Sequence, residues 1–154
     1  MNLLVGSSYA LRRLGRREEA LRRLEDAMGH LNGLGLNPSD KVDLESEAEL
    51  TLRAVADDQA DRGNVTAAID QYQSLLGRVD PDETDPDFNA EDAVHLSTIC
   101  SSLAALHNRA GHADQAAALD KRRTDIWRQL DRKLPNNPFV QRQLADKLLP
   151  VQRR

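Results

Sequence analysis

The chain repeats one pattern three times, in LRRLGRREEAL (Leu11–Leu21), QADRGNVTAAI (Gln59–Ile69) and HNRAGHADQAA (His107–Ala117). Each copy holds a glycine, at position 15, 63 or 111, and consecutive glycines are 48 residues apart. An alanine follows each glycine five residues later, at positions 20, 68 and 116. Glycine adopts the left-handed conformation that ends many helices. The pattern therefore predicts three equivalent bends, each between two antiparallel helices.

The sequence around these bends predicts an all-α fold. Apolar residues make up 40% of the 154 residues but aromatic residues only 3%, and Leu and Ala, which favour helices, dominate. We expect one domain over 1–154, with helix pairs at about 2–36, 38–80 and 87–134. The individual helices are predicted near 2–14, 16–32, 40–62, 64–78, 88–110 and 113–133. A capping helix is predicted over 138–149, with Asn137 as N-cap and Pro138 in its first turn. Because one pair cannot cover its own apolar face, the pairs are expected to stack as a right-handed α-solenoid.

The second connector is an acidic stretch, VDPDETDPDFNAE (Val79–Glu91). Several of its residues match a calcium-loop template, but Asp85 stands where the sharp turn needs glycine, and Pro86 follows it. The stretch also falls in the connector position of the period. We therefore interpret it as a stiff solvated linker, with Asp87 placed to cap the next helix.

The bends resemble those of the tetratricopeptide repeat. The small residues of that family's first helix fall on Ser8, Ala56 and Ala104, and the alanine of its second helix falls on Ala20, Ala68 and Ala116. The large partner falls on Leu24 and Tyr72, but on Asp120 in the third pair, where we expect the core to use instead Leu119, Ile126, Trp127 and Leu130. The period of 48 exceeds the family's value of about 34 by roughly two helical turns in each helix.

A second resemblance concerns DIWRQLDRKLPNNPFVQRQL (Asp125–Leu144), which looks like the tail of long-period helical arrays attached to bacterial serine/threonine kinases. The chain contains no glycine-rich loop, HRD or DFG motif of a kinase domain. This resemblance implies a regulatory or docking portion of a larger signalling protein.

Other classes of function find little support in the residues. The four histidines offer no zinc ligand set, and neither a nucleophile elbow nor a phosphate loop is present, so we expect no metal, no cofactor and no enzyme. Arginines at 12, 13, 16, 17, 22 and 23 alternate with acidic residues and lack an aromatic platform, which argues against nucleic acid. No apolar run approaches the roughly 18 residues of a membrane span. With the single cysteine, Cys100, this indicates a cytoplasmic protein that does not bind membranes.

In the family that the chain resembles, first helices line a concave wall that holds extended peptides. Carried over, the wall consists of Val5, Tyr9, Arg12 and Arg13, then Arg53, Asp57, Ala60 and Asp61, then Ser101, Ala105, Asn108 and Arg109. The carboxylate clamp of that family needs Asn where Tyr9, Asp57 and Ala105 stand, so no such clamp is expected.

These observations predict a non-enzymatic scaffold that binds a peptide or protein on this concave face. Asp57 and Asp61 lie in an acidic middle, residues 37–98, of net charge −12, and favour a basic peptide. The flanking segments carry +2 and +6. This asymmetry leaves two alternatives open, homo-oligomerisation through unlike charges and weak RNA binding by the basic C-terminal third.

Overall fold

The computed structural model describes residues 2–35, 41–79 and 87–145. Over these ranges the chain forms seven helices and no strand, which confirms the predicted all-α class. The helices are α1 (Asn2–Arg13), α2 (Arg17–Gly33), α3 (Glu47–Asp61), α4 (Val65–Val79), α5 (Ala90–Arg109), α6 (Ala113–Lys133) and α7 (Pro138–Ala145). None of these helices combines the length and apolar character that crossing a membrane requires.

The three predicted bends are confirmed and share one geometry. Gly15, Gly63 and Gly111 have φ angles of 74°, 85° and 80°. The residue after each glycine donates its backbone N–H to the carbonyl oxygen five residues earlier, at 2.9, 2.9 and 2.8 Å. The glycine itself bonds the carbonyl three residues earlier. These two hydrogen bonds form the Schellman motif, which satisfies the last carbonyl groups of a helix and turns the chain.

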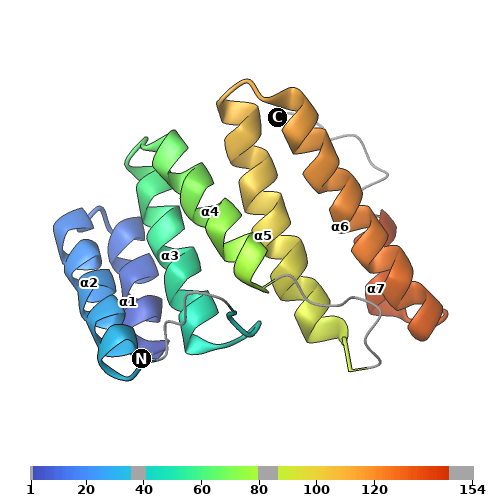
Figure 1. Cartoon of the computed structure of the whole chain (residues 1–154), viewed down its shortest axis with the longest axis horizontal. Helices are drawn as coiled ribbons and strands as arrows, with labels where there is room; N and C mark the ends of the chain where they lie inside the picture. The colour runs from blue at the N-terminus through green and yellow to red at the C-terminus, as the bar shows by residue number, and fades with distance from the viewer. Residues whose placement is uncertain (1, 36–40, 80–86, 146–154) are drawn as a thin grey trace.

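Each bend joins two helices that pack against each other, α1 with α2, α3 with α4 and α5 with α6. Contacts of α3 with α1 and α2, and of α4 with α5, hold neighbouring pairs together, and α7 packs on α6. Figure 1 shows the pairs in chain order along the long axis, from α1 and α2 in blue to α6 and α7 in orange and red. Successive pairs therefore lie next to each other in space.

The small residues predicted at helix crossings are buried in all three pairs. They are Ser8, Ala20, Ala56, Ala68, Ala104 and Ala116. In the third pair Asp120 is exposed, whereas Ile126, Trp127 and Leu130 are buried and Leu119 packs on the core, as expected. Small side chains let helices approach closely, so larger residues beside them interlock. The main cluster runs from Leu31 of α2 to Val140 of α7.

The helix predicted over 40–62 starts later, at residue 47, so the prediction is wrong for residues 41–46. Ser46 caps α3, because its hydroxyl accepts a bond of 3.1 Å from the backbone N–H of Glu49. Glu45, with φ of 62°, leaves the helical conformation just before the cap. Val42 is buried and donates its N–H to the carbonyl of Arg78 at 3.0 Å. The connector is thus anchored on the end of α4 rather than wound into α3.

Asn89, not Asp87, caps α5, which corrects the predicted cap. The Asn89 side chain accepts bonds from the backbone N–H groups of Glu91 and Asp92 at 2.7 and 3.2 Å. In return, the Asn89 backbone N–H donates to the Asp92 carboxylate at 3.1 Å. This reciprocal arrangement is a capping box, and it satisfies the backbone N–H groups of Asn89, Glu91 and Asp92. Asp87 lies two residues before the cap position and does not cap α5.

The cap of the last helix agrees with the sequence. The Asn137 side chain accepts bonds from the backbone N–H groups of Phe139 and Val140 at 3.0 and 3.3 Å. Pro138 opens α7, as predicted. Residues 146–149 of this predicted helix lie outside the described residues, as do Pro38 and residues 80–86 of the acidic connector.

Candidate functional site

Asp57 of α3 lies at the centre of a polar network that joins two first helices, α1 and α3, to α4. Its two carboxylate oxygens accept hydrogen bonds from the hydroxyls of Tyr9 in α1, at 2.6 Å, and Tyr72 in α4, at 2.5 Å. Tyr9 and Asp57 each stand six residues before a turn glycine, so the packing of α1 on α3 brings equivalent positions together. One carboxylate thereby links three helices.

The two tyrosines of this network remain protonated over a wide pH range. Burial raises the pKa of Tyr9 and that of Tyr72 far above the ordinary value, and the negative charge of Asp57 and its hydrogen bonds raise both pKa values further. The guanidinium groups of Arg53 and Arg12 act on the Tyr9 pKa in the opposite direction but are outweighed. Tyrosines held in this way serve as hydrogen-bond donors and not as general bases.

Arg12 extends the network along α1. Its guanidinium lies 5.0 Å from the centre of the Tyr9 ring, a cation–π distance. Its Nε donates to the Asp61 carboxylate at 2.9 Å, and a terminal nitrogen donates to the Asp57 carbonyl at 3.2 Å. Side-chain exposure is 11% for Arg12 and 56% for Asp61, so this ion pair lies at the edge of the network.

Arg109 makes the corresponding connection between α5 and α3, because its guanidinium donates to the Ala60 carbonyl at 3.2 Å. Arg13 and Asn108 are exposed beside these contacts. The residues that the sequence predicts to bind a partner, Ser101 among them, form what we term the first-helix face. Its members are Tyr9, Arg12, Arg13, Arg53, Asp57, Asp61, Ser101, Asn108 and Arg109. The structure brings Tyr9, Arg12, Asp57 and Asp61 into direct contact.

Arg53 belongs to a second network, which the sequence did not predict. It pairs at 3.3 Å with Glu49, four residues earlier, whose side chain is fully buried. The other carboxylate oxygen of Glu49 lies 2.9 Å from Nδ1 of His95 in α5. A serine followed three residues later by glutamate predicts a local capping box. The Ser46 hydroxyl does bond the Glu49 N–H, but the glutamate side chain reaches α5 instead of turning back.

A pocket of about 410 Å³ adjoins Ser101, between α5, α6 and α7. Its wall includes Ser97, Ser101, Ser102, Arg123, Trp127 and Phe139. The Trp127 indole donates to the Ser97 hydroxyl at 3.1 Å, and the Phe139 ring meets it edge-on at 5.8 Å between ring centres. The Ser102 hydroxyl also acts to lower the pKa of Tyr72, against the larger effects of burial and Asp57, so the pocket adjoins the Asp57 network. We term this the α5–α7 pocket.

The two histidines nearest in sequence meet at the third bend. Nδ1 of His107 lies 3.2 Å from Nδ1 of His112, and Nε2 of His107 lies 3.5 Å from the Gln73 amide nitrogen. Burial lowers the pKa of His107, and the neighbouring His112 lowers it further. Across residues 2–35, 41–79 and 87–145, no three His, Cys, Asp or Glu residues converge in a way that could hold a metal ion.

Sequence reasoning missed the participation of Tyr72, Glu49 and His95 in these networks. A signal existed for Tyr72, since a buried tyrosine usually places its hydroxyl on a partner. The pairing of Glu49 with His95 depends on how α3 and α5 meet, which no local pattern encodes.

No protein-family model matches the chain, and comparison with the curated proteins and with the solved structures yields no significant match in either set.

Proposed function

We propose that this chain is a non-enzymatic protein-interaction module, a short right-handed solenoid of tetratricopeptide-like helix pairs. Its first-helix face would bind an extended segment of a partner protein. The observation that carries the proposal is the direct contact between equivalent positions of consecutive first helices, Tyr9 with Asp57. Contacts at the repeat spacing turn separate helices into one continuous surface, as in stacked repeat arrays.

The α5–α7 pocket supports a binding role for this surface. It adjoins Ser101 and combines hydroxyl groups and the Arg123 side chain with the aromatic rings of Trp127 and Phe139. Interfaces commonly use such a hollow to hold one anchoring side chain, while polar groups around it bond the backbone of the bound segment. We infer that one side chain of the partner enters this pocket and the segment continues over Arg109 towards Arg13.

The contacts on this face favour a partner segment with acidic residues. The sequence suggested a basic segment because of Asp57 and Asp61, but Asp57 is engaged by two tyrosines and Asp61 by Arg12. The exposed charges beside them belong to Arg13 and Arg109. Carboxylates of a ligand pair well with guanidinium groups, often through two parallel hydrogen bonds.

Selection from a displayed library of random linear peptides tests this proposal. Peptides enriched on the native chain should carry Asp or Glu, and their affinity should fall about tenfold or more in a double variant, Arg13→Ala with Arg109→Ala, since bonds to charged groups contribute about 1.5–3 kcal/mol each. Arg17→Ala with Arg22→Ala, on the second helix, serves as the charge-matched control. A failure to enrich any peptide, or equal affinity for both double variants, would contradict the proposal.

Self-assembly is a second candidate, favoured by exposed apolar side chains at the ends of the array. Leu3 of α1 is 88% exposed, and Val94 of α5 and Phe139 of α7, which line the α5–α7 pocket, are each 37% exposed. Apolar groups of this size at both ends could pack between copies. Sedimentation over a tenfold range of concentration, at low and high salt, decides the point: a monomer under all conditions rejects self-assembly, and a concentration-dependent increase in mass supports it.

A further inference from the structure

One face of α1 is apolar and open to solvent. Leu3 and Leu14 are 88% and 71% exposed, the highest values among the large apolar side chains of the described residues. Gly6 and Ala10, which lie between them, are exposed too. Leu14 continues the helical hydrogen bonding, because its backbone N–H donates to the Ala10 carbonyl at 3.1 Å. Residues three and four apart share one side of a helix, so these four residues form a single surface, which we term the Leu3–Leu14 face.

The same positions are buried in the other two helix pairs. At the repeat spacing of 48, Leu3, Gly6 and Ala10 correspond to Thr51, Ala54 and Asp58 of α3 and to Ile99, Ser102 and Leu106 of α5. Five of these six equivalent residues are at most 3% exposed, and Ser102 is partly buried. The Leu3–Leu14 face is therefore the α1 version of a face that the fold covers in α3 and α5.

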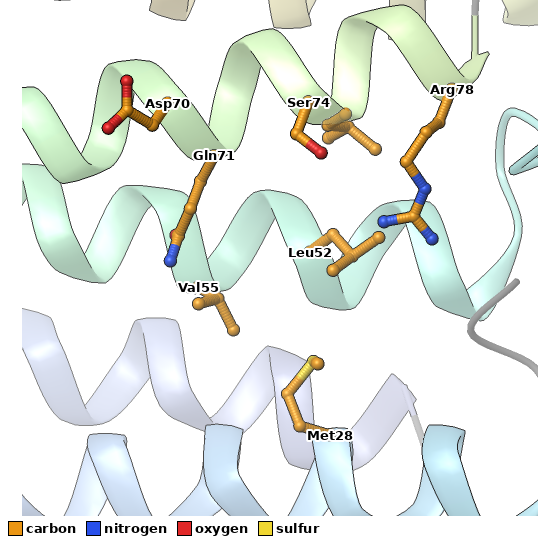
Figure 2. Close-up of a pocket in the computed structure, with 8 residues that line it drawn as sticks. Met28, Leu52, Val55, Asp70, Gln71, Ser74 and Arg78 are labelled. Carbon is orange, nitrogen blue, oxygen red and sulfur yellow. The ribbon is translucent and has the colours of Figure 1, made fainter. Parts of the chain in front are cut away.

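In α3 and α5 the preceding helix pair provides this cover. Ala54 packs in a cluster with Val5 of α1 and Leu24 of α2. Figure 2 shows Met28 of α2 pointing towards Val55 of α3, the residue after Ala54. In the next pair, α4 packs on α5. Contact with another helix is thus the usual state of this face in a stacked array, and across residues 2–35, 41–79 and 87–145 no helix provides it for α1.

We propose that the Leu3–Leu14 face packs against the same face of a second copy of the chain, with the two α1 helices antiparallel about a two-fold axis. A two-fold contact uses one patch on both copies, so the patch has to complement itself. The order of residues meets this condition. A leucine stands at each end of the face, eleven residues or about 16 Å apart, and the two small residues lie between them. In the antiparallel arrangement Leu3 meets Leu14 of the partner subunit, and small residues meet small residues.

The charges of α1 permit this contact. Residues 2–11 contain no charged side chain, so two antiparallel α1 helices bring no like charges together along most of their length. Arg12, which follows, donates to the Asp61 carboxylate of α3 in its own chain. The contact is therefore apolar and should persist at high salt, whereas salt screens an association between the acidic middle and the basic ends of the chain.

This inference deepens self-assembly, the second candidate function, on which it rests, and it leaves the first-helix face to a partner protein. A contact of one helix from each copy is small, so we expect a dimer that dissociates on dilution. A two-fold contact closes on itself, and the mass stops at that of a dimer. Packing of α1 on the α5–α7 pocket of the next copy gives open chains of growing mass instead.

Sedimentation over a wide range of concentrations, at low and high salt, tests the proposal with two matched variants. Gly6→Glu in α1 and Gly29→Glu in α2 add the same charge at exposed helical positions, and no atom lies within 4 Å of a Cβ placed at either. Gly6→Glu should raise the dissociation constant of the dimer about tenfold or more, because the contact would bury one unpaired carboxylate from each copy. Gly29→Glu should leave the constant unchanged, and circular dichroism verifies that both variants fold.

Four outcomes overturn the proposal: a monomer at every concentration, a mass that grows beyond a dimer, a dimer that high salt dissociates, or equal dissociation constants for the two variants. In the last case self-assembly stands and the Leu3–Leu14 face is the wrong surface. Peptides selected on the first-helix face should bind Gly6→Glu and the native chain equally, so the two proposals succeed or fail separately.

Disulfide cross-linking tests the antiparallel arrangement. Leu3→Cys and Leu14→Cys are prepared separately in a Cys100→Ala background, which removes the single native cysteine, and one of the two proteins carries a tag that changes its mass. In a glutathione redox buffer, the mixed disulfide should exceed the half of all links that random pairing gives, because each end of α1 meets the opposite end of the other copy. Adding Gly6→Glu to both proteins should remove this excess. A mixed link that makes up half of the total or less overturns the proposed symmetry.

Discussion

Tyr9 and Asp57 are joined by a hydrogen bond of 2.6 Å, although 48 residues separate them in the chain. The same 48 residues separate the turn glycines, Gly15 and Gly63, so the bond connects the same place in two successive helix pairs. The hydrogen bond from Arg109 to the Ala60 carbonyl makes the same kind of connection between the second and third pairs, across 49 residues of sequence. Contact at the repeat spacing is what stacking of like units requires.

The carboxylate of Asp57 should matter for the stability of the stack. We expect Asp57→Asn to lower the free energy of unfolding by about 2 kcal/mol, because an amide offers one acceptor in place of two and lacks the charge that strengthens both tyrosine bonds. Urea unfolding followed by circular dichroism at constant pH measures the change. Asp61→Asn, which affects an ion pair with an exposed carboxylate, should cost less than about 1 kcal/mol. Equal losses in the two variants would contradict the central role of Asp57.

The left-handed backbone conformation at the bends leads to a second prediction, on the replacement of glycine by alanine. Gly63 has φ of 85°, and no atom lies within 4 Å of a Cβ placed there, so the cost of alanine is purely conformational. We expect Gly63→Ala to destabilise the protein by about 1–2 kcal/mol. Gly77 lies within α4, also with open space around a Cβ, and Gly77→Ala should stabilise the protein by about 0.5–1 kcal/mol. Thermal unfolding of both variants should show shifts of opposite sign; shifts of the same sign would count against the assigned bend.

The lowered pKa of His107 predicts that the stability of the folded protein depends on pH. Burial and His112 lower its pKa in the folded protein, so below the ordinary pKa of about 6.5 the unfolded chain binds more protons than the folded chain. The contribution of His107 to stability is therefore complete above pH 6.5 and is lost as the pH falls from that value to the lowered pKa. Between pH 8 and 5 the native protein should lose more stability than His107→Asn, as measured by urea unfolding at each pH. Parallel pH profiles would rule out this role for His107.

The bends and the core were predictable from the sequence because local chemistry determines them. A glycine at each bend and an alanine five residues later specify a helix end and a close helix crossing, whatever the rest of the chain does. Asn137 before Pro138 predicted the correct cap for the same reason. The late start of α3 also had a local signal, because Ser46 followed by Glu49 is the pattern of a helix cap. The contact between Val42 and the Arg78 carbonyl was not predictable in this way, because the two residues are far apart in sequence.

The pairing of charges on the first-helix face was harder to predict than the fact that they lie close together. Tyr9, Arg12, Asp57 and Asp61 were expected on one wall, and the structure brings them into contact. That they contact each other, and so are paired within the chain, depends on the register between α1 and α3. Sequence shows which charges a face contains but not which of them neutralise one another.

The direct test of the stacking between the first two pairs is a spectrophotometric titration of the tyrosines. The chain contains only two, Tyr9 and Tyr72, and both donate to Asp57. Because burial and Asp57 raise both pKa values, the folded protein gains nothing from ionised tyrosine, and its stability falls as the pH rises above about 10, where the unfolded chain ionises. In Asp57→Asn both tyrosines should titrate at lower pH than in the native protein.

The measurement is the ultraviolet absorbance of tyrosinate in the native protein between pH 8 and 13, with circular dichroism recorded on the same samples. The account predicts no tyrosinate signal near pH 10 and a rise at higher pH that coincides with the loss of helix. A tyrosine that ionises near pH 10 while the helices remain intact would contradict the bond between Tyr9 and Asp57, or that between Tyr72 and Asp57, and with it the joining of α1, α3 and α4 at a single carboxylate.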